Sequence, residues 1–237
     1  MVIRRYVAFD IETAKIVPGE DFNWKPHRPL GITCASVLRC DSKETEAWYG
    51  KKRDGSPAAQ MSRAEAGKLV QALQRLVEKG YTLLTWNGLG FDLDVLAEES
   101  GCLEECREMA LNHVDMMFHV FCDRGFPVKL EKAAQALGIP GKPPGMSGVD
   151  APRSWQEGRH QEVLEYNRQD VRTALGIARE CEKRGRFEWI TKNGEAKSFG
   201  LPRGWLVVRD ANSLPQPDTS WMRTPILRSE FTGWLGI

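Results

Sequence analysis

Residues 6–13, YVAFDIET, form an apolar, β-branched run that ends in two carboxylates two positions apart. Such a run is typical of a buried central strand. Because side chains of a strand alternate between its faces, Asp10 and Glu12 are predicted to project to the same side, while Ile11 packs into the opposite layer. Two carboxylates held this close need a cation or a raised pKa, so the end of this strand is a candidate metal site.

Two further segments alternate between apolar and polar positions, GITCASVLR at 31–39 and ETEAWY at 44–49. A polar turn at 40–43 separates them, so they are predicted to form an antiparallel meander with the first strand. The stretch 15–29, between the first strand and the segment at 31–39, contains three prolines and is expected to be irregular.

A helix is predicted from Ser62, which has Glu65 at the capping-box spacing, to about Lys79, with Gly80 as its stop. A second buried strand, YTLLTW at 81–86, follows directly.

The segment after this second strand begins with the turn NGLG at 87–90 and continues into a helix that starts near Phe91. A strand, a glycine-containing turn and a helix often build a binding site, and Asp92 in the first helical turn could reach over the sheet edge. A tight turn followed by an acid that the helix dipole favours is the alternative.

A long helix is predicted over 161–182, and another over 128–137 that ends at Gly138. Tyr166 and Asp170 are four residues apart on the long helix, which places them on one face. Between the two helices, GKPPGMSG at 141–148 is expected to be a loop that could cover a substrate. It lacks the order of a nucleotide-binding P-loop.

The composition fits one large α/β domain with an appendage: 237 residues, 41% hydrophobic and 27% charged. A formal net charge of +1 neither favours nor excludes nucleic acid. No run approaches the roughly 18 apolar residues of a membrane span. The N-terminus lacks the features of a secretory signal, so a cytoplasmic location is expected. Six cysteines without C-x-x-C spacing favour reduced, mostly buried thiols.

The chain changes character after Arg186, where tryptophans recur at 189, 205, 221 and 234. Lys192 to Glu195, KNGE, is typical of a type I′ hairpin turn. Tryptophans here could stack on bases, although packing against a core is their commoner use. We expect a packed C-terminal appendage.

Taken in order, D-I-E at 10–12, N-G-x-x-F-D at 87–92 and Y-x-x-x-D at 166–170 resemble the three motifs of the DEDD superfamily of 3′–5′ exonucleases. The tyrosine marks the DEDDy branch, and the proofreading-like exonucleases related to family B DNA polymerases are most similar. The resemblance implies a ribonuclease H-like fold, with a mixed five-stranded sheet and helices on both faces. We expect an exonuclease domain at 1–186 and a β-hairpin and Trp-rich appendage at 187–237.

The resemblance also implies roles for the site residues. Asp10 would bridge two magnesium or manganese ions, Glu12 and Asp170 would complete the first ion's site, and Asp92 would serve the second, partly through water. Such ions activate a water and neutralise charge on the scissile phosphate. Tyr166 would orient that water, with a general-base role left open.

Thr13 and Asn87 would, by the same resemblance, lie beside the terminal nucleotide of the substrate. That substrate would be the 3′ end of a single strand, and the sequence does not decide between DNA and RNA.

Three rival interpretations remain. An endonuclease on the same fold would tolerate other residues in place of Tyr166. A silent nucleic-acid-binding or scaffold protein would not need mutually repelling carboxylates. Zinc at Cys102, Cys106, His113 and His119 is disfavoured by the short central spacer. Asp115, inside an apolar run, is interpreted as equally consistent with a buried structural acid and is left out of the site.

Overall fold

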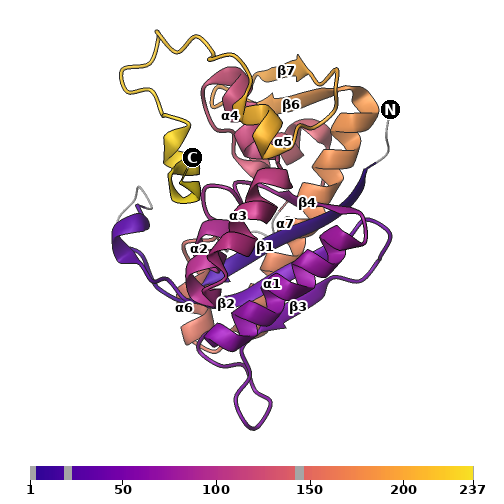
Figure 1. Cartoon of the computed structure of the whole chain (residues 1–237). Helices are drawn as coiled ribbons and strands as arrows, with labels where there is room; N and C mark the ends of the chain where they lie inside the picture. The colour runs from indigo at the N-terminus through magenta and orange to yellow at the C-terminus, as the bar shows by residue number, and fades with distance from the viewer. Residues whose placement is uncertain (1–3, 19–22, 142–146, 237) are drawn as a thin grey trace.

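The computed structural model describes residues 4–18, 23–141 and 147–236 (Figure 1). Its main sheet has five strands in the order β3-β2-β1-β4-β5. They are β1 Arg5–Thr13, β2 Ile32–Arg39, β3 Glu46–Tyr49, β4 Tyr81–Thr85 and β5 Val114–Asp115. β1, β2 and β3 pair antiparallel, which confirms the predicted meander, whereas β4 pairs parallel with both β1 and β5. The sheet is therefore mixed, with β1 at its centre.

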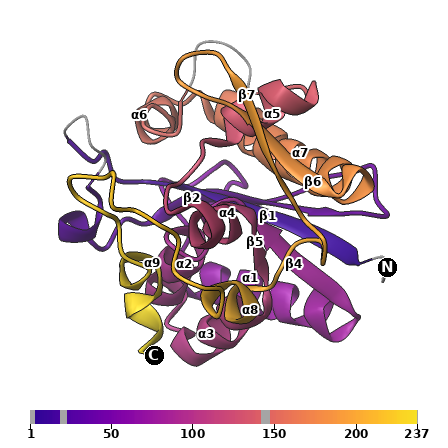
Figure 2. The same cartoon turned by 90° about the horizontal axis from the view of Figure 1, so that it is seen from above.

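Helices cover both faces of this sheet (Figure 2). One face carries α1 Arg63–Glu78, α2 Asp92–Ser100 and α3 Leu103–Asn112, and the other carries α5 Leu130–Leu137, α6 Ala151–Gln156 and α7 His160–Arg184. α4, Met116–Arg124, follows β5 directly. The helices predicted over 63–79, 128–137 and 161–182 are thus confirmed, with ends shifted by one or two residues.

The alternation along β1 divides the core as predicted. Val7, Phe9 and Ile11 pack into one apolar cluster with α1 and α2. Tyr6 and Ala8 pack into the other, with α5 and α7. Asp10 and Glu12 continue the second series, so they project toward α7.

The start of α1 shows why local sequence signals succeeded here. Ser62 Oγ accepts from the backbone N–H of Glu65, and a carboxylate oxygen of Glu65 accepts from the backbone N–H of Ser62. This capping box satisfies two backbone donors that the first helical turn leaves over. At the other end Gly80 has a φ of 82°, which glycine adopts without strain.

The C-terminal region contains a separate two-stranded hairpin of β6 Arg186–Ile190 and β7 Ala196–Gly200. It is followed by α8 Val208–Asn212, α9 Ser229–Thr232 and a 3₁₀ turn at Gly233–Leu235. Trp189 and Trp205 are buried and Trp234 is partly buried, as packing tryptophans should be. Trp221, by contrast, is 66% exposed.

The prediction of a type I′ turn in this hairpin was wrong. A type I′ turn needs a positive φ at both central residues, here Asn193 and Gly194. Gly194 has a φ of 82°, but the φ of Asn193 is not positive, since Asn87 is the one described residue other than glycine with a positive φ. Gly194 N–H bonds to Thr191 C=O, and Thr191 N–H bonds to Glu195 C=O. The loop is thus longer, a tight turn followed by a left-handed glycine, and the Thr191 hydroxyl fixes it by accepting from Glu195 N–H.

Other expectations have simple outcomes. All six cysteines are free thiols, and four of them are buried. Over the described part of the chain, no helix is both long and apolar enough to cross a bilayer. The expected irregular stretch at 15–29 holds a single 3₁₀ turn, Lys25–His27, in its described part. The expected loop at 141–148 falls mostly on 142–146, outside the described residues.

Candidate active site

Three carboxylates from distant parts of the sequence meet at the end of the central strand. Asp10 and Glu12 come from β1 and Asp170 comes from α7, and one oxygen of each lies within 4.8 Å of the others. Glu12 and Asp170 are each 6% exposed, so little water screens their charges. The predicted strand end and the predicted helix face therefore build one acidic site.

The pairing of β1 with β2 is regular where β1 carries its two acids, with Asp10 opposite Ser36 and Glu12 opposite Cys34. Both acids therefore keep the two-residue period of the strand and project to the same face. The register shifts just beyond them, between Glu12 and Thr13, where β2 has one extra residue, Thr33. The Thr33 hydroxyl donates to the Glu12 carbonyl at 3.0 Å. Bulges of this kind are common beside active sites.

Asp92 occupies the gap where β1 and β4 separate. Pairing of the two strands ends at Ala8 and Leu84, and beyond that point Asp92 Oδ1 accepts from the backbone N–H of Ile11 at 2.9 Å. Burial raises the pKa of Asp92 to about 7, with Asp115 and Asp170 adding to the rise. Because the pKa of Asp92 is higher in the folded than in the unfolded state, the protein loses stability as pH rises from the unfolded pKa of this acid toward 7. An ionised Asp92 therefore needs a compensating positive charge.

Asn167 orients Asp10, and sequence reasoning missed it. Its Nδ2 donates to Asp10 Oδ2 at 2.7 Å, although the two residues are 157 positions apart. Asn167 is fully buried. The available signal was its place on α7 three residues before Asp170, on the face that holds the acids.

The turn at 87–90 is fixed by packing as well as by hydrogen bonds. A Cβ at Gly88 would lie 2.5 Å from Thr85 Oγ, and one at Gly90 would lie 2.8 Å from the Phe231 ring. Asn87 adopts a φ of 72°, a left-handed conformation in which asparagine is enriched. Its Oδ1 is buried and has no hydrogen-bond partner among the described residues.

Asp115 holds this turn in place, and the sequence interpretation left it out of the site. Its Oδ1 accepts from the N–H groups of Asn87 and Phe118 at 3.0 Å, and its Oδ2 accepts from Leu89 N–H at 2.9 Å. The side chain is 1% exposed. Asp115 is therefore a positioning residue that acts through Asn87, and its signal in the sequence was that it is the single carboxylate within the apolar run 113–122.

Replacing Asp115 by alanine should destabilise the protein by about 3 kcal/mol, because it leaves three backbone donors without their acceptor. For a chain of this size that corresponds to a melting temperature lower by roughly 10 °C. Thermal denaturation followed by circular dichroism measures it. Asp123→Ala, at an exposed position on α4, is the matched control and should melt like the wild type. Equal melting of both variants would contradict the role of Asp115.

The clustered acids and the turn at 87–90 border a cleft of about 290 Å³. Its walls include all the residues that the sequence singled out for the site: Asp10, Glu12, Thr13, Asn87, Asp92, Tyr166 and Asp170. Trp86 and Phe91 add apolar surface. Tyr166 is 2% exposed and comes from the same helix as Asp170, one turn earlier.

Comparison with known proteins agrees with this fold. A family model described as the RNase H superfamily matches residues 7–181. The chain belongs to the RNase H superfamily. No curated protein matches it in sequence. Among solved structures, the family B DNA polymerase from the hyperthermophilic archaeon Pyrobaculum calidifontis is similar, with a TM-score of 0.52 and 18% identity over 76% of this chain. The match spans only 25% of that polymerase chain and supports the fold alone.

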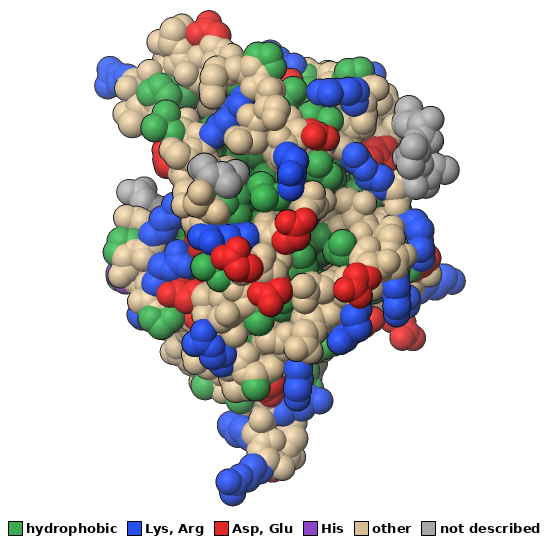
Figure 3. Space-filling view, viewed as in Figure 1, with side chains coloured by type: hydrophobic (Ala, Val, Ile, Leu, Met, Phe, Trp, Pro, Cys, Tyr) green, Lys and Arg blue, Asp and Glu red, His purple; other side chains and the backbone are tan. Residues whose placement is uncertain are grey.

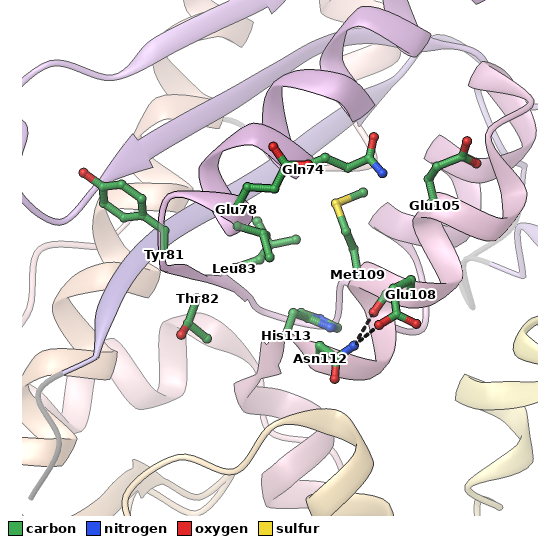
Figure 4. Close-up of a pocket in the computed structure, with 11 residues that line it drawn as sticks. Gln74, Glu78, Tyr81, Thr82, Leu83, Glu105, Glu108, Met109, Asn112 and His113 are labelled. Carbon is green, nitrogen blue, oxygen red and sulfur yellow. Dashed lines mark hydrogen bonds between the residues drawn. The ribbon is translucent and has the colours of Figure 1, made fainter.

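The distribution of charged side chains on the surface does not point to a binding site. Basic and acidic side chains are interspersed over the face shown in Figure 3, as a net charge of +1 leads one to expect. A second hollow of about 210 Å³ lies between α1, α3 and the start of β4 (Figure 4). Its acids, Glu78, Glu105 and Glu108, do not meet in one cluster, and Glu108 accepts from Asn112 instead.

The structure gives no support to a zinc site at Cys102, Cys106, His113 and His119. Within the described ranges, the acidic triad is the one group of three or more metal-ligand side chains close enough to hold an ion. Both nitrogens of the His113 ring have partners, Thr85 Oγ and the Ala110 carbonyl. His119 accepts from Leu206 N–H, and burial lowers its pKa to about 4. These histidines are core residues.

Proposed function

We propose that the chain is a metal-dependent 3′–5′ exonuclease that hydrolyses phosphodiester bonds from the 3′ end of single-stranded DNA or RNA. The observation that supports it most is the meeting of Asp10, Glu12 and Asp170 within 4.8 Å in the cleft that Tyr166 also lines. Membership of the RNase H superfamily and similarity to a family B DNA polymerase agree with a nuclease.

The donor set fits divalent cations. Carboxylate oxygens are the ligands that magnesium and manganese prefer, and close, mostly buried carboxylates repel one another without a cation. We propose that Asp10, Glu12, Asp92 and Asp170 hold two such ions. When bound, they would lower the pKa of the attacking water and offset charge on the phosphate and leaving oxygen.

The protein's own side chains position the reactants in this proposal. Asn167 fixes the orientation of Asp10 through its hydrogen bond. The Tyr166 hydroxyl orients the attacking water, and Thr13 and Asn87 contact the terminal nucleotide in the cleft. The Asn87 amide oxygen is buried and has no partner among the described residues, so it would accept a hydrogen bond from that nucleotide once its side chain turns toward the cleft.

A silent binding or scaffold protein is the main rival, and the close carboxylates argue against it. A protein that only binds nucleic acid, which is an anion, has no use for three clustered acids in its cleft. Digestion of matched DNA and RNA oligonucleotides with magnesium, with manganese and with a chelator tests the proposal. We expect shortening that stops in chelator, and intact oligonucleotides under all conditions would refute a nuclease.

Tyr166→Phe should lower the turnover rate by about tenfold to 100-fold, because it keeps the ring and its packing but removes the hydroxyl that orients the water. The cation concentration for half-maximal activity should change little. Tyr49→Phe, a partly buried tyrosine on β3 that packs on Trp155, is the matched control. Unaltered turnover of Tyr166→Phe at saturating cation would mean that the hydroxyl has no part in the reaction.

A further inference from the structure

A groove of about 700 Å³ lies between the hairpin β6–β7 and the segment from Arg124 to Lys132. The hairpin follows residue 181, where the match to the superfamily ends. Among the residues that the structure describes, five basic side chains and no acidic one line the groove: Arg124, Lys129, Lys132, Lys192 and Lys197. The charge of its lining therefore differs from the interspersed basic and acidic side chains on the face shown in Figure 3.

Three of these cations are not neutralised by an acid. Arg124 pairs with Asp123 at 2.8 Å and Lys197 pairs with Glu195 at 3.0 Å. Lys129, Lys132 and Lys192 have no acidic partner within 4.0 Å anywhere in the described parts of the chain. A concave surface with uncompensated positive charge attracts an anion of extended shape.

The groove also presents aromatic rings. Phe126 and Trp189 line it, with ring centroids 6.1 Å apart. Trp221 lies edge-on to Phe126 at 6.2 Å and is 66% exposed, although indole is among the most costly side chains to leave in water. A positively charged groove with aromatic rings beside it is the arrangement by which proteins bind single-stranded nucleic acid without sequence preference.

The groove and the active-site cleft share a boundary. Trp86 lines the cleft, and its indole N–H donates to the carbonyl of Val128, which lines the groove, at 3.1 Å. Trp86 also packs on Phe187 of β6 with centroids 6.2 Å apart. This contact places a residue that lines the cleft beside a residue that lines the groove, so the groove lies in a direction that a strand with its 3′ end in the cleft could follow.

We propose that this groove binds the single-stranded segment 5′ to the nucleotide being removed. The lysines contact successive phosphates, and Trp221 and Phe126 stack on bases. This inference rests on the proposed exonuclease function for the identity of the strand, and it assigns the C-terminal hairpin a role in holding substrate.

Binding in chelator tests the groove without cleavage. The probes are 5′-fluorescein oligothymidylates of 16 and 4 nucleotides, followed by fluorescence anisotropy. Lys129→Gln/Lys192→Gln should bind the 16-mer roughly tenfold more weakly than the wild type at low salt, with the 4-mer little affected. The slope of log affinity against log salt should fall by about 1.4, since each single-strand phosphate contact contributes about 0.7.

The matched control is Lys43→Gln/Lys79→Gln, which removes the same charge. Both lysines are exposed, and they lie near Arg5 at the start of β1, the opposite end from the acids. This control should bind both probes like the wild type. Equal weakening by the two double variants would show a general effect of net charge and would overturn the groove.

Stacking is tested separately with Trp221→Ala, which should weaken binding of the 16-mer roughly tenfold, whereas Trp221→Phe should restore most of it. Trp221 is exposed, so neither change should lower the melting temperature. Wild-type affinity of Trp221→Ala, or equal competition by a 16-residue poly-glutamate, would overturn the proposal by showing that stacking plays no part.

The two proposals fail in distinguishable ways. Suppose that the wild type shortens oligonucleotides, and that the groove variants bind and degrade the 16-mer as well as the wild type. The groove inference is then wrong, and the proposed exonuclease function stands. If the groove variants weaken binding but the wild type shortens nothing with either cation, the exonuclease fails instead. With both correct, the groove variants raise KM for the 16-mer and leave kcat unchanged.

Discussion

Asp10→Asn should lower the rate of nucleic-acid hydrolysis by about 10³-fold or more. Asp10 is the member of the triad that Asn167 holds in place, and its oxygen lies within 4.8 Å of those of Glu12 and Asp170. Cations contribute several kcal/mol of charge stabilisation in the transition state, and each 1.4 kcal/mol is tenfold in rate. The substitution keeps the shape of the side chain and removes its charge.

The fold should survive this substitution. Removing one of three close carboxylates relieves repulsion, so the melting temperature in chelator should hold or rise. Asp210→Asn, at an exposed position on α8, is the matched control for the charge change and should leave the rate unchanged. A wild-type rate in Asp10→Asn would show that the triad has no part in the reaction. A large fall in melting temperature would mean that loss of activity reflects unfolding and does not test the triad.

Much of the fold could be predicted because local patterns and tertiary environment agree. The alternation along residues 6–13 placed the acids on the face toward α7, and the capping box placed the start of α1. Four-residue spacing put Tyr166 and Asp170 in one cleft. In each case a short-range rule, the strand period or the helix period, fixed the answer.

Contacts that depend on long-range geometry could not be predicted. The bond of Asn167 to Asp10 joins positions 157 apart, and no local rule names the partner. Asp115 accepts from three backbone groups of two different segments, which needs the turn at 87–90 and β5 to be placed first. The hairpin turn was mispredicted because Asn193-Gly194 suits a type I′ turn by residue type, while Thr191 stabilises a longer loop.

A second large effect is expected from the form of the substrate. A free 3′ end should be required, with a circular strand at least about 100-fold slower, because the cleft of about 290 Å³ is at the small end of ligand sites and suits one terminal nucleotide. An internal phosphate brings a nucleotide on both sides, and the walls of the cleft, which include Trp86 and Phe91, should leave little room for the second one. A 3′-phosphate should also slow the reaction, since it adds charge where the terminal nucleotide contacts the cleft.

The most direct test of a 3′–5′ exonuclease is digestion of a 5′-labelled linear single strand beside a circular strand of the same sequence, with magnesium or manganese. The account predicts a ladder that shortens one nucleotide at a time from the 3′ end, an intact circle, and no reaction in chelator or with Asp10→Asn. Rapid cutting of the circle would contradict it by showing that the cleft admits internal phosphates, and the protein would then be an endonuclease on the same fold.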